Sequence, residues 1–222
     1  MPTHETVIVR GDVTIDETAI IEPYAIIDGP AWIGPHAYIG AHACIGAPAQ
    51  HHGSYPAPTD APHEPKGVRV EAHACVREYA TIHQGVVSET RVGANTLLMA
   101  GCHIAHDCVI GEDVTMGSFS ILGGFTLIDH GATFGQGVVT HPWTLIGESA
   151  MVGLNSSVVK DVEPFAKVAG SPARLLGTNT HRAPDLPSEY QDAILSADVW
   201  DRWSRLADQR DQLREAWRQL TA

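Results

Sequence analysis

The chain has 222 residues and a formal net charge of −12, with 26 acidic and 14 basic side chains. This balance argues against nucleic acid as a partner, and the lack of a basic-apolar leader or a long apolar run predicts a cytoplasmic protein without membrane insertion. Residues 1–159 carry five Lys and Arg against sixteen Asp and Glu, whereas residues 160–222 carry nine against ten. An anionic partner is therefore expected to prefer the C-terminal third.

Bulky apolar residues recur every six positions through most of the chain. They stand at Ile15, Ile21, Ile27, Ile33, Ile39 and Ile45, then at Val70, Val76 and Ile82, and then from Val92 to Val158 with Thr140 as the one polar member. In the first block an alanine stands four positions after each of these isoleucines, which is also two positions before the next inward position. Such a period predicts a parallel β-helix in which each hexad is one short strand and a turn. Three hexads would make one triangular coil, so residues eighteen apart are expected to stack, in about seven coils.

Two insertions interrupt this repeat, at residues 51–69 and 88–91. The first is rich in Pro and His, and proline cannot donate to a strand ladder, so it is expected to form an external loop. Loops that leave a solenoid commonly gather on one binding face. The sequence thus predicts a solenoid over residues 1–180, an all-β fold, followed by a short helical segment over residues 181–222.

The C-terminal segment has helical spacing. Ser188 and Gln191 form a candidate capping box, and apolar residues then recur with a helical period at Val199, Trp203, Leu206, Leu213, Trp217 and Leu220. The pattern predicts an amphipathic helix or helix pair. Its expected role is to cap the open end of the solenoid and to pack at a subunit interface, because an uncapped end exposes a sheet edge.

The four cysteines, Cys44, Cys75, Cys102 and Cys108, have no CxxC spacing and fall at hexad positions otherwise held by small core residues. They are predicted to be reduced packing residues rather than disulfide partners or metal ligands.

One corner of the predicted solenoid concentrates groups that carry chemistry. The run from His103 to Asp107 places two imidazoles and a carboxylate together, and a carboxylate beside His106 is what a general base needs to fix its tautomer. Gly124 lies eighteen residues after His106, so its backbone N–H is expected to lie one strand away and to suit an oxyanion. His141 falls near the same corner, and His83 lies in the coil region before His106.

At these residues the chain resembles a known family. The strings VREYATIHQG, residues 76–85, and LLMAGCHIAHDCVIG, residues 97–111, are similar to those of the UDP-N-acetylglucosamine acyltransferases of lipid A synthesis. The resemblance covers roughly residues 10–180. It implies a left-handed parallel β-helix, a homotrimer, and transfer of an acyl group from an acyl carrier protein thioester to a sugar nucleotide.

The resemblance also implies roles for particular residues. His106 matches the general base, Asp107 the carboxylate that orients it, and Gly124 the oxyanion donor. Positions that contact substrate are His103, His141, Gln50 and Asn179, and His83 is placed with them. Leu154, with Met151 beside it, matches a residue that limits acyl chain length. No metal or bound cofactor is implied, since the acyl-phosphopantetheine thioester is a co-substrate.

Several positions depart from the family's pattern. Phe125 stands in place of a further active-site histidine and Pro142 in place of a glutamine. His51, Gly53 and His181 replace an aspartate, a lysine and a glutamate, and Arg182-Ala183 lacks the family's paired arginines. The acceptor is therefore left open as a hydroxyl or amine of a sugar nucleotide or of a related amino sugar.

Three alternatives remain from the sequence. A transferase that uses a coenzyme A thioester would share the same corner. A γ-type carbonic anhydrase would use three histidines on zinc, for which His83, His103 and His106 are candidates, although their spacing differs from that family's. A scaffold without catalysis would leave the His103–Asp107 corner without purpose.

Overall fold

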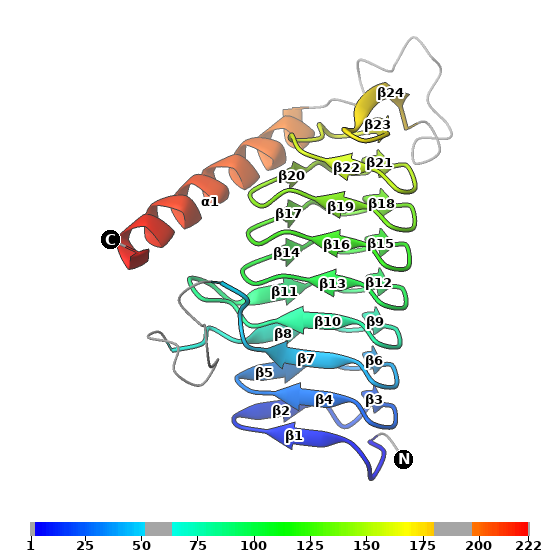
Figure 1. Cartoon of the computed structure of the whole chain (residues 1–222), viewed down its shortest axis with the longest axis vertical. Coiled ribbons are helices and arrows are strands. Elements are labelled where there is room, and N and C mark those ends of the chain that lie inside the picture. The colour runs from blue at the N-terminus through cyan, green and yellow to red at the C-terminus, as the bar shows by residue number, and fades with distance from the viewer. Residues whose placement is uncertain (1–2, 52–63, 180–196, 222) are drawn as a thin grey trace.

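The computed structural model describes residues 3–51, 64–179 and 197–221. The chain winds through three sheets that form the walls of a triangular prism, and one long helix lies against its side (Figure 1). Ile8 pairs with Ile26 and Ile26 with Cys44, so one coil takes eighteen residues. The left-handed parallel β-helix expected from the sequence is confirmed.

The strands are short and fall into three sheets, named here sheets 1, 2 and 3. Sheet 1 contains β1 (Ile8–Arg10), β4 (Ile26–Asp28), β7 (Cys44–Ala47), β10 (Thr81–His83), β13 (His103–Ile104), β16 (Ile121–Leu122), β19 (Val139–Thr140) and β22 (Ser157–Val158). Sheet 2 contains β2 (Val13–Ile15), β5 (Ala31–Ile33), β8 (Val68–Val70), β11 (Thr90–Val92), β14 (Val109–Ile110), β17 (Leu127–Ile128) and β20 (Leu145–Ile146). Sheet 3 contains β3 (Ile20–Ile21), β6 (Tyr38–Ile39), β9 (Cys75–Val76), β12 (Leu97–Leu98), β15 (Thr115–Met116), β18 (Thr133–Phe134), β21 (Met151–Val152), β23 (Ala166–Ala169) and β24 (Arg174–Thr178).

The core is the column of inward-facing residues that the six-residue period predicts. The bulky positions from Ile21 to Val158 and the small ones between them form a single buried cluster. Burial of this continuous apolar column is the main favourable contribution to the free energy of folding, because the strands in the coils of the β-helix are only two to four residues long. All four cysteines are free thiols, and burial raises the pKa of Cys102 to about 11 and that of Cys108 to about 12.

The insertions begin and end at different residues from those predicted. Val68 and Arg69 belong to β8, and Thr90 and Arg91 belong to β11, where they pair with the neighbouring coils. The first insertion therefore lies between β7 and β8, with residues 52–63 outside the described part. The four extra residues of the second lie between β10 and β11, before Thr90 rather than at 88–91.

The C-terminal helix also differs from its predicted place. The described part of this segment is one helix, α1 (Ala197–Thr221), and the candidate capping box at Ser188 lies outside the described residues. Instead of closing the open end, α1 runs obliquely down the side of the prism, over sheet 2 (Figure 1). Its Leu213 and Trp217 pack against the outward-facing Leu127 and Leu145. The last coil is covered instead by the antiparallel β23–β24 pair.

Candidate functional site

The candidate site lies on the corner where sheet 1 turns into sheet 2. Two columns run along this corner at eighteen-residue intervals: His106, Gly124 and Pro142 in one, and Asp107, Phe125 and Trp143 in the other. Asp107, Phe125 and Trp143 all have positive φ, between 59° and 68°, and each lies in the turn that takes the chain round the corner from a strand of sheet 1 to a strand of sheet 2. The repeat thus places one residue of each column in every coil.

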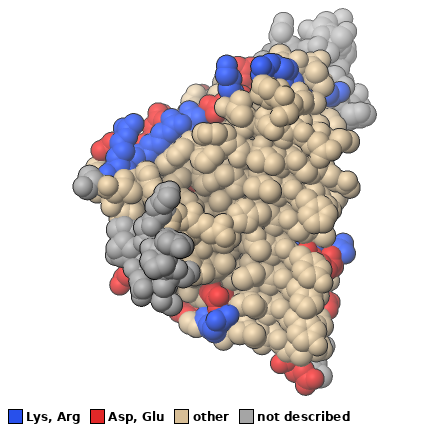
Figure 2. All heavy atoms as spheres, in the orientation of Figure 1, with Lys and Arg blue, Asp and Glu red and all other residues tan. Residues whose placement is uncertain are grey.

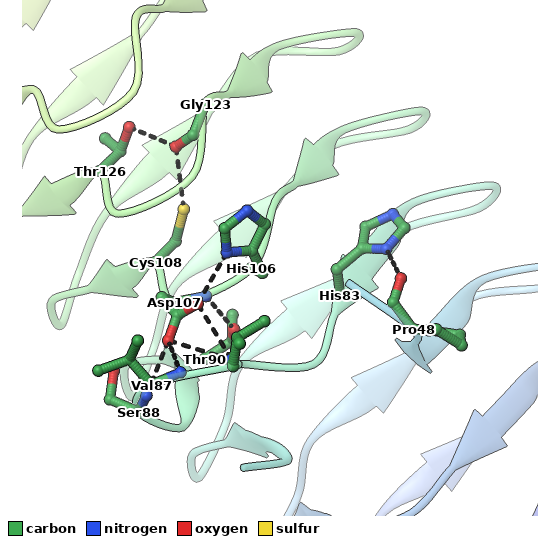
Figure 3. A network of polar contacts seen from close by, with 11 residues as sticks. Pro48, His83, Val87, Ser88, Thr90, His106, Asp107, Cys108, Gly123 and Thr126 are labelled. Carbon is green, nitrogen blue, oxygen red and sulfur yellow. Dashed lines mark hydrogen bonds and ion pairs between the residues drawn. The ribbon is translucent and has the colours of Figure 1, made fainter. Parts of the chain in front are cut away.

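His106 and Asp107 form the hydrogen-bonded pair predicted from their adjacency (Figure 3). His106 Nδ1 lies 2.7 Å from Asp107 Oδ2, and the His106 side chain is only 10% exposed. Because the carboxylate accepts the proton on Nδ1, the lone pair of a neutral ring is on Nε2. This is the tautomer that a general base requires.

Asp107 is fully buried and is held by a turn that the sequence did not identify. Its carboxylate accepts hydrogen bonds from the backbone N–H groups of Val86, Val87 and Ser88 at 2.7–3.2 Å, and its own N–H donates to Thr90 Oγ1 (Figure 3). The extra residues between β10 and β11 supply these three donors. The insertion therefore fixes the carboxylate that orients His106.

Gly124 faces Nε2 of His106, as the eighteen-residue spacing predicts. A Cβ atom on Gly124 would lie 2.9 Å from Nε2 and 3.0 Å from Cε1, so the imidazole is seated over the bare α-carbon. The N–H groups of Gly123 and Phe125 donate to Thr140 and His106, whereas the N–H of Gly124 has no acceptor within the described residues. The arrangement provides a base and a free backbone donor at one point.

His103 and His83 lie on the outer face of sheet 1, beside this corner. Their ring centroids are 4.8 Å apart. His103 Nδ1 bonds Thr81 Oγ1 at 2.8 Å, and His83 Nδ1 donates to the carbonyl of Pro48 at 2.7 Å. Burial lowers the pKa of both imidazoles, so both are favoured in the neutral form.

The lowered pKa of His83 predicts a dependence of stability on pH. The unfolded chain, with a histidine pKa near 6.5, takes up a proton at a higher pH than the folded protein does. The contribution of neutral His83 to the free energy of unfolding is therefore complete above a pH of about 6.5, and it is lost as pH falls through and below that value. We expect the free energy of unfolding in urea to fall between pH 7.5 and pH 5.5, with a shallower fall in His83→Gln. The exposed His4→Gln is the control, and an equally shallow slope there would contradict the assignment.

Aromatic rings surround His106 in a way that the sequence did not reveal. Phe125 meets His106 edge-on at 5.2 Å and stacks on Trp143 at 3.7 Å. Trp217 of α1 lies 6.0 Å from His106, and His51 lies 5.8 Å from it. The apolar helical stripe indicated that Trp217 would be buried, but nothing in that stripe indicated against which surface.

The other predicted substrate residues divide between this corner and more distant parts of the prism. His141 is exposed, one coil beyond Gly123, and Gln50 is exposed between Pro48 and His51. Met151 lies in β21 of sheet 3, Leu154 lies in the turn from sheet 3 to sheet 1, and Asn179 donates to the carbonyl of Ser149 at the corner of sheets 2 and 3. Within one chain these three residues are not brought to His106.

The described residues contain one group whose atoms could share a metal ion, and it does not include the candidate zinc histidines. Asp129, His130 and Glu148 have ligand atoms within 4.8 Å of one another. His130 bridges the two carboxylates at 3.2 Å and 3.0 Å, and Arg202 of α1 binds Glu148. The group is therefore an ion-pair network that attaches the start of α1 to sheet 2. His83, His103 and His106 do not converge on a common point in one chain.

The comparisons with known proteins agree with the fold and with the corner. Residues 89–124, which include His106 and Gly124, match the family model of the bacterial transferase hexapeptide, six repeats. This part of the chain is thus similar to the hexapeptide repeats of bacterial transferases, and the fold that contains it is a left-handed parallel β-helix.

The similarity to UDP-N-acetylglucosamine acyltransferases, expected from the sequence, is confirmed. The protein from Myxococcus xanthus named acyl-[acyl-carrier-protein]–UDP-N-acetylglucosamine O-acyltransferase is 49% identical over 109 residues, or 47% of this chain and 42% of that protein. The UDP-N-acetylglucosamine acyltransferase structure from Campylobacter jejuni superposes with a TM-score of 0.71 at 26% identity, over 91% of this chain and 82% of that one. The Francisella novicida structure has a TM-score of 0.70 at 22% identity, over 96% and 86%, and supports the fold alone. The chain matches a little under half the length of the curated relatives.

No helix in the described part of the chain is long and apolar enough to cross a membrane.

Proposed function

We propose that this protein is an acyltransferase that moves an acyl group from an acyl carrier protein thioester to a hydroxyl or amine of a sugar nucleotide or related amino sugar. The observation that carries the proposal is the His106–Asp107 pair with Gly124 opposite Nε2. The names of the relatives supply the donor and the class of acceptor.

The proposed reaction is a direct attack without a covalent acyl-enzyme. His106 Nε2 removes the proton of the acceptor hydroxyl as its oxygen bonds to the thioester carbonyl carbon. The resulting oxyanion accepts a hydrogen bond from the Gly124 N–H. When the tetrahedral intermediate collapses, the carbon–sulfur bond breaks and the leaving thiolate takes the proton from His106. Asp107 keeps Nδ1 protonated and stabilises the imidazolium between the two transfers.

To test this function, the protein is incubated with one acyl donor and one acceptor at a time. Acyl carrier protein and coenzyme A thioesters of matched chain length are each incubated with a panel of UDP-sugars and amino sugars, and the products are read by mass spectrometry. We expect an acylated sugar with the carrier protein thioester. Product from coenzyme A thioesters alone would reassign the donor, and hydrolysis without sugar acylation would contradict the proposal.

Assembly into a homotrimer is supported by the outer face of sheet 1. Apart from the Arg10–Asp28 ion pair in the first two coils, its outward side chains are aliphatic or uncharged polar groups, and Figure 2 shows this face almost free of acidic and basic side chains. Ile8, Ile121 and Val139 are all more than 40% exposed there. A nearly uncharged surface with exposed aliphatic side chains is often covered in soluble proteins, and neighbouring copies packed against it would form a cleft beside the His106 corner.

The trimer leads to a prediction about mass. We expect light scattering at micromolar concentration to give three times the 23.8 kDa chain mass, in a C3 assembly. Ile121→Glu buries a charge in the proposed interface and is expected to shift the mass toward the monomer. Ser204→Glu on the exposed side of α1 adds the same charge and should leave the trimer intact. A monomer mass for the unaltered protein would refute the assembly.

Leu154 carries the prediction about acyl chain length. It is 68% exposed and sits at a corner remote from His106 in its own chain, so a ruler at this position acts on a neighbour's site. Each buried CH₂ contributes ~0.8 kcal/mol, so a two-carbon change in space alters selectivity by roughly tenfold. We expect short or medium chains to be preferred and Leu154→Gly to favour longer ones in a homologous series of thioesters. Leu175→Gly, also exposed, is the matched control, and identical rankings would rule the ruler out.

A further inference from the structure

A pocket of about 470 Å³ opens farther along the same corner, between the last coils and α1. Its lining includes His141, Pro142 and Trp143 from the corner, Lys160 from the coil beyond, and Arg210 and Arg214 from α1. The pocket is therefore formed by two parts of the chain, the last coils and α1, whose lining residues are 49 or more positions apart.

The pocket is positively charged in a strongly acidic chain. Three cationic side chains line it against one carboxylate, Asp161. Arg210 is only 14% exposed and donates to Asp161 Oδ2 at 2.7 Å, so this pair is neutral and fixes α1 to the prism. Two cations are left for a ligand, Lys160 and Arg214, and Figure 2 shows basic side chains along α1 on this side.

Neither remaining cation is neutralised by a carboxylate in the pocket. Lys160 has no acidic partner within the described residues. Arg214 is 38% exposed, and its acidic neighbour is Asp211, at 3.4 Å on the solvent side of α1. The Arg214 guanidinium lies over the Trp143 ring, 5.5 Å from its centroid, and this holds the group at the pocket wall. A planar guanidinium held in this way can bind two oxygens of one phosphate.

The register of the solenoid connects this pocket to His106. Lys160 follows β22, which is three coils beyond β13, so it lies at the same corner of the prism as His106. At ~4.8 Å per coil, these two strands are separated by about 14 Å along the prism. Both groups lie on one corner, at a separation that a single elongated substrate can span.

We propose that this pocket binds a phosphate or diphosphate group of a substrate, through Arg214 and Lys160. The inference rests on the proposed function for the identity of that substrate. The proposed site would also supply cations that the sequence lacks elsewhere, because the paired arginines of the resembled family have no counterpart at Arg182-Ala183. Here cations from a different element, α1, occupy the active corner. The phosphate belongs either to a sugar nucleotide or to the phosphopantetheine arm of the acyl donor.

Binding is tested first, without catalysis, using inorganic pyrophosphate and isothermal titration calorimetry. We expect Arg214→Gln and Lys160→Gln each to raise the dissociation constant roughly tenfold, since each removes a charge-assisted contact. Arg218→Gln, one turn farther along α1 and paired with Glu215, removes the same charge outside the pocket and should change binding less than about twofold. Failure of the unaltered protein to bind pyrophosphate, or equal loss in Arg214→Gln and Arg218→Gln, would overturn the proposal.

Kinetics then identify the source of the phosphate. If Arg214→Gln raises KM for the sugar nucleotide and leaves KM for the acyl donor unchanged, the pocket holds the acceptor diphosphate. A rise confined to the acyl donor assigns the pocket to phosphopantetheine. If no donor and acceptor pair gives product, the proposed function fails, while the pyrophosphate titration still decides whether the anion site exists. Unchanged KM for both substrates would remove the pocket from the substrate path and contradict the proposal.

Discussion

His106→Ala is expected to lower kcat by ~10²–10⁴-fold, the usual contribution of a general base. The expectation follows from three observations: Nδ1 is bonded to a buried carboxylate, Nε2 is directed at Gly124, and no other histidine of the described chain has both features. The measurement is kcat with the donor and acceptor pair found by mass spectrometry. A variant that keeps more than a third of the original rate would exclude His106 as the base.

The fold should survive this substitution, because His106 lies at a corner and is not part of the buried apolar cluster. Circular dichroism and the mass in solution provide that check. His36→Ala, at an exposed turn residue of an early coil, is the matched histidine control and should retain activity.

Gly124→Ala is expected to lower kcat by roughly 10²-fold, by moving the imidazole out of position. The added Cβ would lie 2.9 Å from His106 Nε2, and a displacement of about 1 Å at a reacting group is enough for a loss of this size. Gly124 does not have positive φ, so alanine is compatible with its backbone. The loss should therefore appear in kcat and not in the urea midpoint.

A double-variant cycle makes this expectation specific. In a His106→Ala background the new methyl group has room, so adding Gly124→Ala should cost little further activity. Full additivity of the two losses would mean that Gly124 acts independently of the imidazole, and the contact between them would then not explain the effect.

The core and the register were predictable from the sequence because the period itself encodes them. Once Ile27 and Ile45 are known to be eighteen apart and inward, stacking follows, and the same count places Gly124 next to His106. The prediction of the core used only the size of each inward side chain, bulky or small, and not its identity. This is why the prediction also succeeded at positions where the core residue is Met116 or Phe134.

The turn that holds Asp107 was not predictable by the same count. Four residues are inserted between Ile82 and Val92, and the period does not say where in that interval they lie. Thr90 contained the missing signal, since it stands two residues before Val92 at the small inward position that alanine holds elsewhere. If Thr90 is assigned to the strand, the insertion must lie before residue 90, where the amides that bind the Asp107 carboxylate are found.

The place of α1 could not be derived because an amphipathic stripe specifies a buried face but not the surface that covers it. The receiving surface had its own signal in Phe125, Leu127, Trp143 and Leu145, which are large apolar residues at turn or outward positions of the late coils. An outward leucine in a single strand is ordinary. Only the agreement of consecutive coils on sheet 2 marks the surface as a docking face.

The eighteen-residue coil also makes distance along the active corner a quantity that changes in whole steps. Deleting or duplicating one coil between Phe125 and Trp143 would alter the separation of His106 from Lys160 by one strand spacing, ~4.8 Å, and leave the residues at both ends unchanged. Substrate length in such a protein is therefore set by the number of repeats between two fixed groups. A point substitution changes what is recognised at either end, whereas a change in repeat number alters the length of molecule that fits between them.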